Sequence, residues 1–287
     1  MKLCLVDASG YIFRAFYTRP PMVKTDGTPV GAIYGYCEML RDLLRNNDAT
    51  HMAVILDAGR SGREQIDPDY KGNRKPKPDE LITQLKMLED ATASHGIATV
   101  KVDGMEADDV IATYALQAVR MGGEAVIYSS DKDLMQLLES GVSIYDPMKK
   151  QNVDADICRE RVGVYPHQVM DYLALVGDAS DNIPGVPGIG AKGAATLLRE
   201  HGDLETILRI AEQTPSLLSC TLKQRESLRI NSSLANKSRD LVQLKMVDGC
   251  PELDALEWSQ PDPARLGAYL REMEFAVLAR DLEQMAA

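Results

Sequence analysis

The sequence has no pair of cysteines at C-x-x-C spacing, and its four histidines are scattered along the chain. Zinc sites usually combine closely spaced cysteine and histidine ligands, so a zinc site is not expected. The five cysteines are an odd number, which favours free and mostly buried thiols in a reducing compartment. We therefore expect a cytoplasmic protein.

Long apolar runs are also missing. A membrane-spanning helix needs about 20 consecutive apolar residues, and every apolar run in this chain falls far short of that length. The first residues, Met1 to Asp7, meet a charge too early for a secretory signal. With 287 residues and 45% hydrophobic content, the chain can bury a sizeable core in one large domain or two joined ones.

Basic residues are outnumbered, with 32 Lys and Arg against 43 Asp and Glu and a net charge of −11. Such a balance is unusual for a nucleic-acid-binding protein, whose affinity depends on neutralising phosphates. The basic residues gather locally, however, because residues 60–77 hold six of them against three acidic ones. A local positive face is compatible with an acidic total, and the alternative is an ordinary solvated loop.

Three apolar segments rich in strand-forming residues each run into an aspartate. These acids are Asp7, Asp57 and Asp131, and the segments cover residues 2–6, 52–56 and 125–130. Residues 31–46 have apolar residues at helical spacing between the first two segments. Strands that alternate with helices predict an α/β fold with a mostly parallel central sheet flanked by helices. The carboxyl ends of parallel strands meet at one edge, so the three acids are expected to gather there.

Three further acids, Glu106, Asp108 and Asp109, precede an apolar helix over residues 110–119. Helix capping explains one or two acids in a first turn. Three acids that converge with the aspartates at the sheet edge, Asp133 included, would repel one another unless divalent cations lay among them. Since only oxygen ligands are available, the sequence favours Mg²⁺ or Mn²⁺.

The segment from Gly177 to Gly193 joins a pair of acids to a glycine-rich turn. Asp178 and Asp181 are three positions apart, a spacing at which both carboxylates reach one hard cation. The turn then enters a helix at residue 191, and free amides at such an entrance suit a phosphate. A G-x-G-x-x-G match within the turn lacks the preceding strand of a dinucleotide site. The simpler alternative is a Gly/Pro turn between two ordinary helices.

With these acids, the segment resembles the helix–hairpin–helix element of the 5′-nuclease (flap endonuclease) family. The resemblance covers nearly the whole chain, and it is closest to the N-terminal 5′→3′ exonuclease domain of bacterial DNA polymerase I and its stand-alone relatives. It implies a PIN-like nuclease core in residues 1–150, with a helical arch near residues 59–80. It also implies a helical region in residues 151–287, with a DNA-binding helix–hairpin–helix near residues 170–202.

The resemblance assigns roles to individual residues. Nine acids stand where the family keeps its metal carboxylates: Asp7, Asp57, Glu106, Asp108, Asp109, Asp131, Asp133, Asp178 and Asp181. Lys71 and Arg74 stand where the family has catalytic cations. The DNA-binding set that it implies comprises Arg14, Arg63, Tyr70, Lys71, Arg74, Gly185, Gly188, Gly190 and Lys192. Ser61-Gly62-Arg63 departs from the family, whose members usually carry a Thr-Phe-Arg triplet there.

The function that the resemblance implies is a structure-specific 5′→3′ exonuclease and flap endonuclease. The expected cofactors are two or more Mg²⁺ ions, which Mn²⁺ replaces, and a K⁺ ion in the hairpin. The expected partners are DNA with 5′ flaps, nicks or overhangs, RNA primers, and a fused or separate DNA polymerase, with the nuclease itself a monomer. Two alternatives stay open: a non-catalytic structure-specific DNA-binding module, and a single-strand ribonuclease on a PIN-like core. The complete acid set disfavours the first, and a hairpin suited to duplex phosphates disfavours the second.

Overall fold

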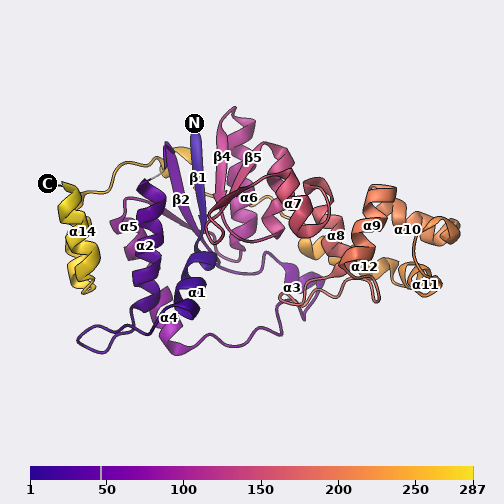
Figure 1. Cartoon of the computed structure of the whole chain (residues 1–287), viewed down its shortest axis with the longest axis horizontal. Coiled ribbons are helices and arrows are strands. Elements are labelled where there is room, and N and C mark those ends of the chain that lie inside the picture. The colour runs from indigo at the N-terminus through magenta and orange to yellow at the C-terminus, as the bar shows by residue number, and fades with distance from the viewer. Residues whose placement is uncertain (46, 287) are drawn as a thin grey trace. The chain divides into compact units, whose positions relative to one another are not determined.

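The computed structural model describes residues 1–45 and 47–286, which fold into two compact units that alternate along the chain (Figure 1). Unit 1 comprises Met1–Ala58, Pro76–Ser129 and Val247–Ala287. Unit 2 comprises Gly59–Lys75 and Ser130–Met246. This division differs from the single boundary predicted near residue 150, because segments far apart in the sequence pack together in each unit.

Unit 1 is built on parallel strands in the order β3-β2-β1-β4. The strands are β1 (Lys2–Asp7), β2 (His51–Leu56), β3 (Ala98–Lys101) and β4 (Glu124–Tyr128). In β1, Cys4 and Val6 pack into the core beside the helices, and the alternate residues Leu3 and Leu5 are also fully buried. Successive side chains of a strand point to opposite faces, so β1 is covered on both faces, as in a parallel sheet enclosed by helices. The mostly parallel α/β fold expected from the sequence is confirmed.

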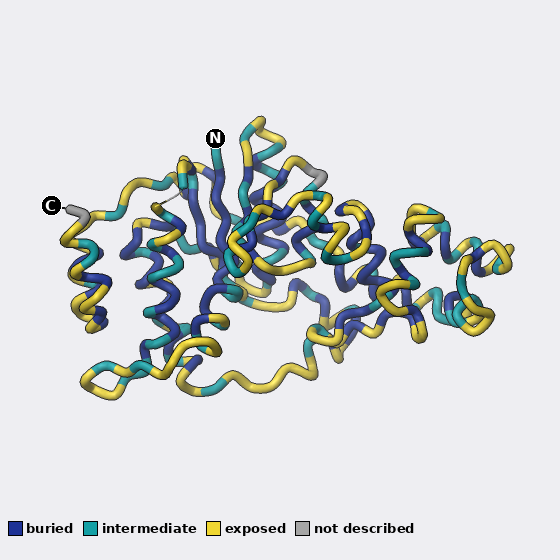
Figure 2. The backbone as a smooth tube through the Cα atoms, in the orientation of Figure 1, coloured by how far each residue is buried: buried dark blue, intermediate teal, exposed yellow. Residues whose placement is uncertain are grey.

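The helices of unit 1 supply that cover. They are α1 (Ala8–Thr18), α2 (Gly31–Arg45), α4 (Asp79–Leu85), α5 (Leu88–Ser94), α6 (Ala107–Arg120), η4 (Leu253–Leu256), α13 (Pro263–Glu272) and α14 (Ala276–Ala286). One core contains Ile33, Tyr36 and Leu40 of α2 together with Leu270 and Phe275 near the C-terminus. Figure 2 shows the strands and the inner faces of these helices as buried.

His95 is a core residue of unit 1 whose charge depends on pH. It is 3% exposed, its Nδ1 lies 2.7 Å from the Ala91 carbonyl oxygen, and burial lowers its pKa. The unfolded state then binds a proton more readily than the folded state, so stability is fully present above the ordinary histidine pKa and is lost as the pH falls below it. The loss is at most about 1.4 kcal/mol per pH unit.

We expect this loss to disappear in the His95→Asn variant, whose amide nitrogen replaces the Nδ1 donor without titrating. Thermal unfolding at pH 7.5 and 5.5 tests it: the drop in Tm between the two pH values should be larger for the wild type than for the variant. Equal drops in the two proteins would contradict the assignment of a neutral buried His95.

Unit 2 is mostly helical. Its only strands among the described residues are β5 (Val142–Asp146) and β6 (Gln151–Val153), which pair antiparallel. Its helices are α3 (Arg63–Ile66), η1 (Asp133–Ser140), α7 (Ala155–Val162), η2 (Pro166–Gln168), α8 (Val169–Val176), α9 (Ala191–His201), α10 (Leu204–Gln213), η3 (Pro215–Leu217), α11 (Leu222–Ile230) and α12 (Ser232–Val242). Helices α8 and α9 lie on either side of the glycine-rich turn, as the helix–hairpin–helix expectation requires.

The five cysteines are free thiols, and three of them, Cys4, Cys37 and Cys158, are buried. This agrees with the expectation from their number and spacing. No helix in the described part of the chain has the length and apolar character of a bilayer span.

Candidate metal and nucleic-acid site

Asp7 links the end of β1 to the start of α1. Its Oδ1 accepts hydrogen bonds from the Ser9 and Gly10 amides at 2.9 and 3.4 Å, and its Oδ2 accepts one from the Ser129 hydroxyl at 2.9 Å. The carboxylate is 7% exposed. Asp7 thus caps a helix, which is the ordinary role of an acid at a strand end. The bond from Ser129 comes from the end of the neighbouring strand β4, so it also brings the two strand ends together.

The other predicted metal ligands of unit 1 cluster around the start of α6. Asp57 accepts a hydrogen bond from the Ala107 amide at 2.9 Å and another from the Ser9 hydroxyl at 2.8 Å. Glu106 is the N-cap residue of α6 and is 3% exposed, and Asp109 in the first turn is fully buried. Asp108 lies beside them in the same turn. The predicted metal ligands of unit 1 therefore lie at the carboxyl ends of the strands and at the start of α6, and Ser9 bridges Asp7 and Asp57.

The acids of unit 2 include a crowded pair around η1. The Asp133 amide donates to Asp131 Oδ1 at 2.9 Å, and Asp133 Oδ1 is buried without a hydrogen-bond partner among the described residues. Burial, and then the charges of Asp131, Asp178 and Asp181, raise the pKa of Asp133. Desolvation of the carboxylate, followed by the charges of Asp181 and Asp178, also raises the pKa of Asp131, although the residue as a whole is exposed. A cation among these carboxylates would relieve both effects.

Asp178 is held differently, because it is bonded to Lys132 and Ser180. Its Oδ2 lies 2.6 Å from Lys132 Nζ, and its Oδ1 accepts from the Ser180 amide at 2.7 Å and hydroxyl at 2.6 Å. Burial opposes ionisation of Asp178, but the bonds from Lys132 and Ser180 outweigh it and leave the pKa of Asp178 below its ordinary value. Sequence reasoning missed both partners. The only signal in the sequence was that each partner lies between two predicted metal ligands: Lys132 between Asp131 and Asp133, and Ser180 between Asp178 and Asp181.

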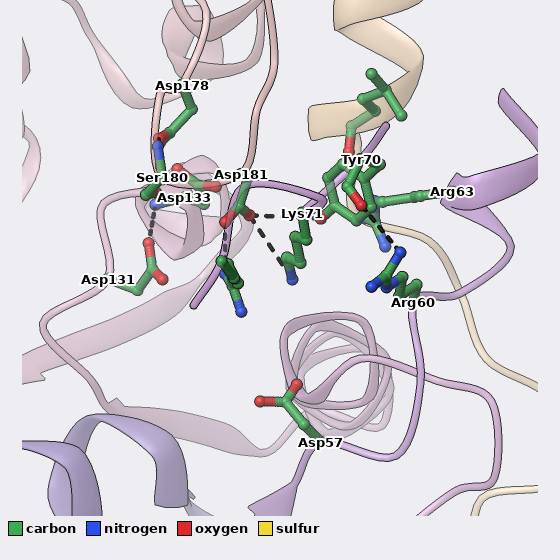
Figure 3. Close-up of polar contacts among 12 residues, drawn as sticks. Asp57, Arg60, Arg63, Tyr70, Lys71, Asp131, Asp133, Asp178, Ser180 and Asp181 are labelled. Atoms are coloured by element: carbon green, nitrogen blue, oxygen red, sulfur yellow. Dashed lines mark hydrogen bonds and ion pairs between the residues drawn. The ribbon is translucent and has the colours of Figure 1, made fainter. Parts of the chain in front are cut away.

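The basic segment of residues 59–75, here called the basic loop, reaches the second acid of the hairpin. Lys71 Nζ lies 3.7 Å from Asp181 Oδ2 (Figure 3). Arg74 Nη2 lies 2.5 Å from Asp181 Oδ1. The Tyr70 hydroxyl also donates to Asp181 Oδ2 at 3.4 Å. Two predicted catalytic cations and a predicted metal carboxylate, more than 100 residues apart in the sequence, therefore meet in unit 2.

Hydrogen bonds to backbone carbonyls join the basic loop to the segment around Asp178 and Asp181. The Lys71 amide donates to the Asp181 carbonyl at 2.9 Å, and the Asn73 side chain donates to the Ala179 carbonyl at 2.7 Å. In return, the Asn182 side chain donates to the Asp69 carbonyl at 2.8 Å. Lys71 and Asn182 adopt positive φ angles of 55° and 58°. Such angles are uncommon in residues other than glycine. The hydrogen bonds of the Lys71 amide and the Asn182 side chain stabilise the two residues in these conformations.

Arg63, which the sequence assigned to DNA binding, is buried. It is 3% exposed, its Nε donates to the Leu241 carbonyl at 2.6 Å, and its Nη2 donates to the Gln243 carbonyl at 2.8 Å. Lys245 Nζ donates to the Ser61 carbonyl at 2.9 Å. The triplet that departs from the family pattern is thus anchored to the end of α12, and Arg63 supports the basic loop in this structure. Tyr70 is also buried, at 2% exposure.

The predicted helical arch is a turn-rich loop here. Within residues 59–78 the one helix is the four-residue α3. Pro68, Pro76 and Pro78 lack the amide that a helix needs, and Gly72 disfavours a helix further. Arg74 is exposed on this loop.

The glycine-rich turn combines a buried base with an exposed tip. Gly185 is buried, and the Val186 amide donates to the Leu175 carbonyl at 2.8 Å. Gly188 and Gly190 are exposed, with no atom within 4 Å of an added Cβ. Lys192 follows on the exposed side of α9, and the remaining predicted DNA-binding residue, Arg14, is exposed on α1 of unit 1. A tip without side chains allows close approach of another backbone.

Gly185 and Gly190 should respond differently to alanine. At Gly185 the φ angle is 61°, and a Cβ would lie 2.4 Å from the Gly177 nitrogen and 2.5 Å from the Val176 carbonyl carbon. Because both contacts are with backbone, we expect Gly185→Ala to reduce the free energy of unfolding by about 2–4 kcal/mol. Gly190→Ala is the matched control and should leave it nearly unchanged. Denaturant unfolding of both variants checks this, and equal stability would contradict the close backbone packing.

The oxygen ligands of these carboxylates suit a hard cation, although the carboxylates do not form a preorganised metal site. Across residues 1–45 and 47–286, no group of three acidic, histidine or cysteine side chains has the arrangement of a ready-made metal site. The Asp133 oxygen without a partner among the described residues and the raised pKa values of Asp131 and Asp133 nonetheless fit a divalent cation bound among these carboxylates. In unit 2 the residues that would hold it are Asp131, Asp133, Asp178 and Asp181.

Two family models match the chain in succession. The 5′-3′ exonuclease N-terminal resolvase-like domain matches residues 2–163, and the 5′-3′ exonuclease C-terminal SAM fold matches residues 164–264. The first match alone covers more than half of the chain.

Curated relatives include both stand-alone and longer proteins. A 5′-3′ exonuclease of Aquifex aeolicus is 33% identical, over 99% of this chain and 96% of the relative. DNA polymerase I of Rhizobium leguminosarum is 44% identical over 97% of this chain. This chain spans only 28% of that polymerase.

Solved structures show the same fold. The bacteriophage T5 5′-exonuclease with bound divalent zinc ions is 26% identical, with a TM-score of 0.70 over 85% of this chain and 90% of that one. A complex of the T5 flap endonuclease with DNA and metal ions shares the fold at 24% identity, with a TM-score of 0.69 over 100% and 99% of the two chains. Its two family-model matches and its relatives together show that this chain belongs to the 5′-3′ exonuclease family.

Proposed function

We propose that this protein is a Mg²⁺-dependent 5′ nuclease that hydrolyses phosphodiester bonds near the 5′ end of flapped, nicked or overhanging DNA and of RNA primers. The observation that carries the proposal is the meeting of Lys71 and Arg74 with Asp181. Two cationic side chains of the basic loop lie in contact with a carboxylate of the predicted metal-binding set. Hydrolysis at a phosphate needs both positive side chains and metal-binding carboxylates close together. Catalysis of phosphoryl transfer rests mainly on such positioning and charge neutralisation.

Lys71 and Arg74 would exchange partners when substrate binds. In this structure Asp181 holds both cations. Divalent cations bound by the carboxylates would supply the Lewis acidity for attack of water on the phosphorus. Asp181 would be among the residues that hold this metal. Arg74 would then donate two parallel hydrogen bonds to the scissile phosphate, and Lys71 would add a positive charge there.

The exposed glycine tip and Lys192 would hold the duplex backbone. Backbone amides at the start of a helix contact phosphates without reading bases, so recognition follows the structure of the DNA. We also propose the K⁺ ion at this hairpin and action as a monomer in the cytoplasm, beside a fused or separate DNA polymerase. The T5 relative, a flap endonuclease in complex with DNA and metal ions, supports DNA as the substrate.

Cleavage of a labelled 5′-flap duplex and of a matched single strand, each with Mg²⁺ and with EDTA, tests the proposal. We expect metal-dependent cutting near the flap junction and little cutting of the single strand. Tight binding of the flap in Mg²⁺ without cutting would favour the DNA-binding module instead. Preferential cutting of single-stranded RNA would favour the ribonuclease.

A further inference from the structure

Unit 2 contains a cavity of about 290 Å³ that the proposed chemistry does not use. Its walls come from residues 130–135 around the start of η1, from the end of β5 and from α7 and α8. Three basic residues line it: Lys132, Lys149 and Arg161. The volume lies just below the range of roughly 300–1,000 Å³ that is typical of small-molecule sites. It suits a ligand the size of one nucleotide.

The single acid of this cavity is already saturated. Asp146 is 2% exposed, and its Oδ1 accepts from the Ser130 hydroxyl at 2.7 Å and from the Met148 and Lys149 amides at 2.9 and 3.1 Å. Its Oδ2 pairs with Arg161 Nη1 at 2.7 Å. Asp146 therefore has little capacity left to neutralise further positive charge in the cavity.

Two basic groups remain for a ligand. Arg161 Nη2 is buried and has no hydrogen-bond partner within the described residues. Lys149 is exposed and forms no ion pair with any residue that the structure describes. A buried guanidinium donor without an acceptor is costly, and an anion at this place would satisfy it while pairing with Lys149. Lys132, by contrast, is already paired with Asp178.

The rest of the cavity is apolar and contains one aromatic ring. Tyr172 of α8 lines it beside Met135, Met148 and Leu173. An aromatic face among apolar side chains is a common support for a nucleobase, because every base can stack on it. A cationic end and an aromatic wall thus occur in one space of nucleotide size.

The cavity also adjoins the predicted metal carboxylates. Ser130 and Lys132 flank Asp131 in the sequence, and Gly177 precedes Asp178; all three residues line the cavity. We propose that this cavity binds a nucleoside 5′-monophosphate, with the phosphate on Lys149 and Arg161 and the base against Tyr172. The inference rests on the proposed function in one respect: a 5′ exonuclease releases this product beside the site.

Binding of dAMP to the full chain in EDTA tests the proposal, because EDTA removes any binding through divalent metal. Calorimetry should give a Kd of about 1 mM or below. Lys149→Glu should weaken binding at least about tenfold, since it removes a charge-assisted bond and adds repulsion. The matched control is Lys150→Glu, which changes the same charge at an exposed neighbour that does not line the cavity. Deoxyadenosine and inorganic phosphate should both bind more weakly than dAMP.

The proposal is overturned if dAMP does not bind in EDTA, if both lysine variants weaken it equally, or if inorganic phosphate binds as tightly as dAMP. The first result would mean that water alone satisfies Arg161. The flap assay separates this inference from the proposed function. Cleavage without dAMP binding overturns only the cavity assignment, and dAMP binding without cleavage supports the cavity while the nuclease proposal fails.

Discussion

Replacing Asp181 with alanine is expected to reduce the cleavage rate of a 5′-flap duplex by about 1,000-fold, which corresponds to roughly 4 kcal/mol of transition-state stabilisation. Asp181 is the carboxylate that holds Lys71 and Arg74 in this structure. The variant should bind the flap at least as tightly as the wild type, because it loses a negative charge beside both cations. Single-turnover cleavage and an equilibrium binding assay in Ca²⁺ would measure the two effects separately.

Asp240→Ala is a suitable control for Asp181→Ala. Asp240 is exposed on α12 of the same unit, so its loss changes the net charge equally. We expect it to cleave at nearly the wild-type rate. If Asp181→Ala lost binding and cleavage in equal proportion, Asp181 would have a structural role and not the metal-binding role proposed above.

Replacing Arg63 with methionine is expected to destabilise unit 2 by about 3 kcal/mol and to lower Tm by about 6–10 °C. The change keeps much of the apolar volume but leaves the Leu241 and Gln243 carbonyls without the donors that they have now. Buried acceptors that lose their partners cost more than the original bonds contribute. Arg63→Lys should recover little of the loss, because one ammonium cannot copy the geometry of two guanidinium donors.

Lys75→Met separates this effect from the loss of a positive charge on the basic loop. Lys75 is exposed in the same loop, and we expect its variant to unfold at the wild-type temperature. Calorimetric scans of the three variants measure the differences. A stable Arg63→Met protein with weakened DNA binding would contradict the anchoring role and restore the DNA-binding role predicted from the sequence.

The sequence alone predicted the parallel core well. A strand that is buried on both faces is apolar at successive positions, so the long strands appear in the sequence as continuous apolar runs. The runs before Asp7 and Asp57 became β1 and β2, and the acids lie at their ends. The strands β3 and β6 were missed. They have four and three residues, too few for a pattern to emerge. The expected helical arch was replaced by turns, although its prolines were visible in the sequence.

Arg63 and Arg74 show what only the tertiary structure decided. Both are arginines in the same basic segment, and both were assigned to DNA. Arg63 is buried against the carbonyls at the end of α12, about 180 residues later, whereas Arg74 stays exposed beside Asp181. The cavity beside Asp131 likewise depends on α7 and α8 meeting the end of β5 and the start of η1. The sequence determined which segments are apolar and which chemical groups are present, since those follow from local composition. The partners of each charged group depend on long-range packing, which brings together segments with no local signal of their proximity.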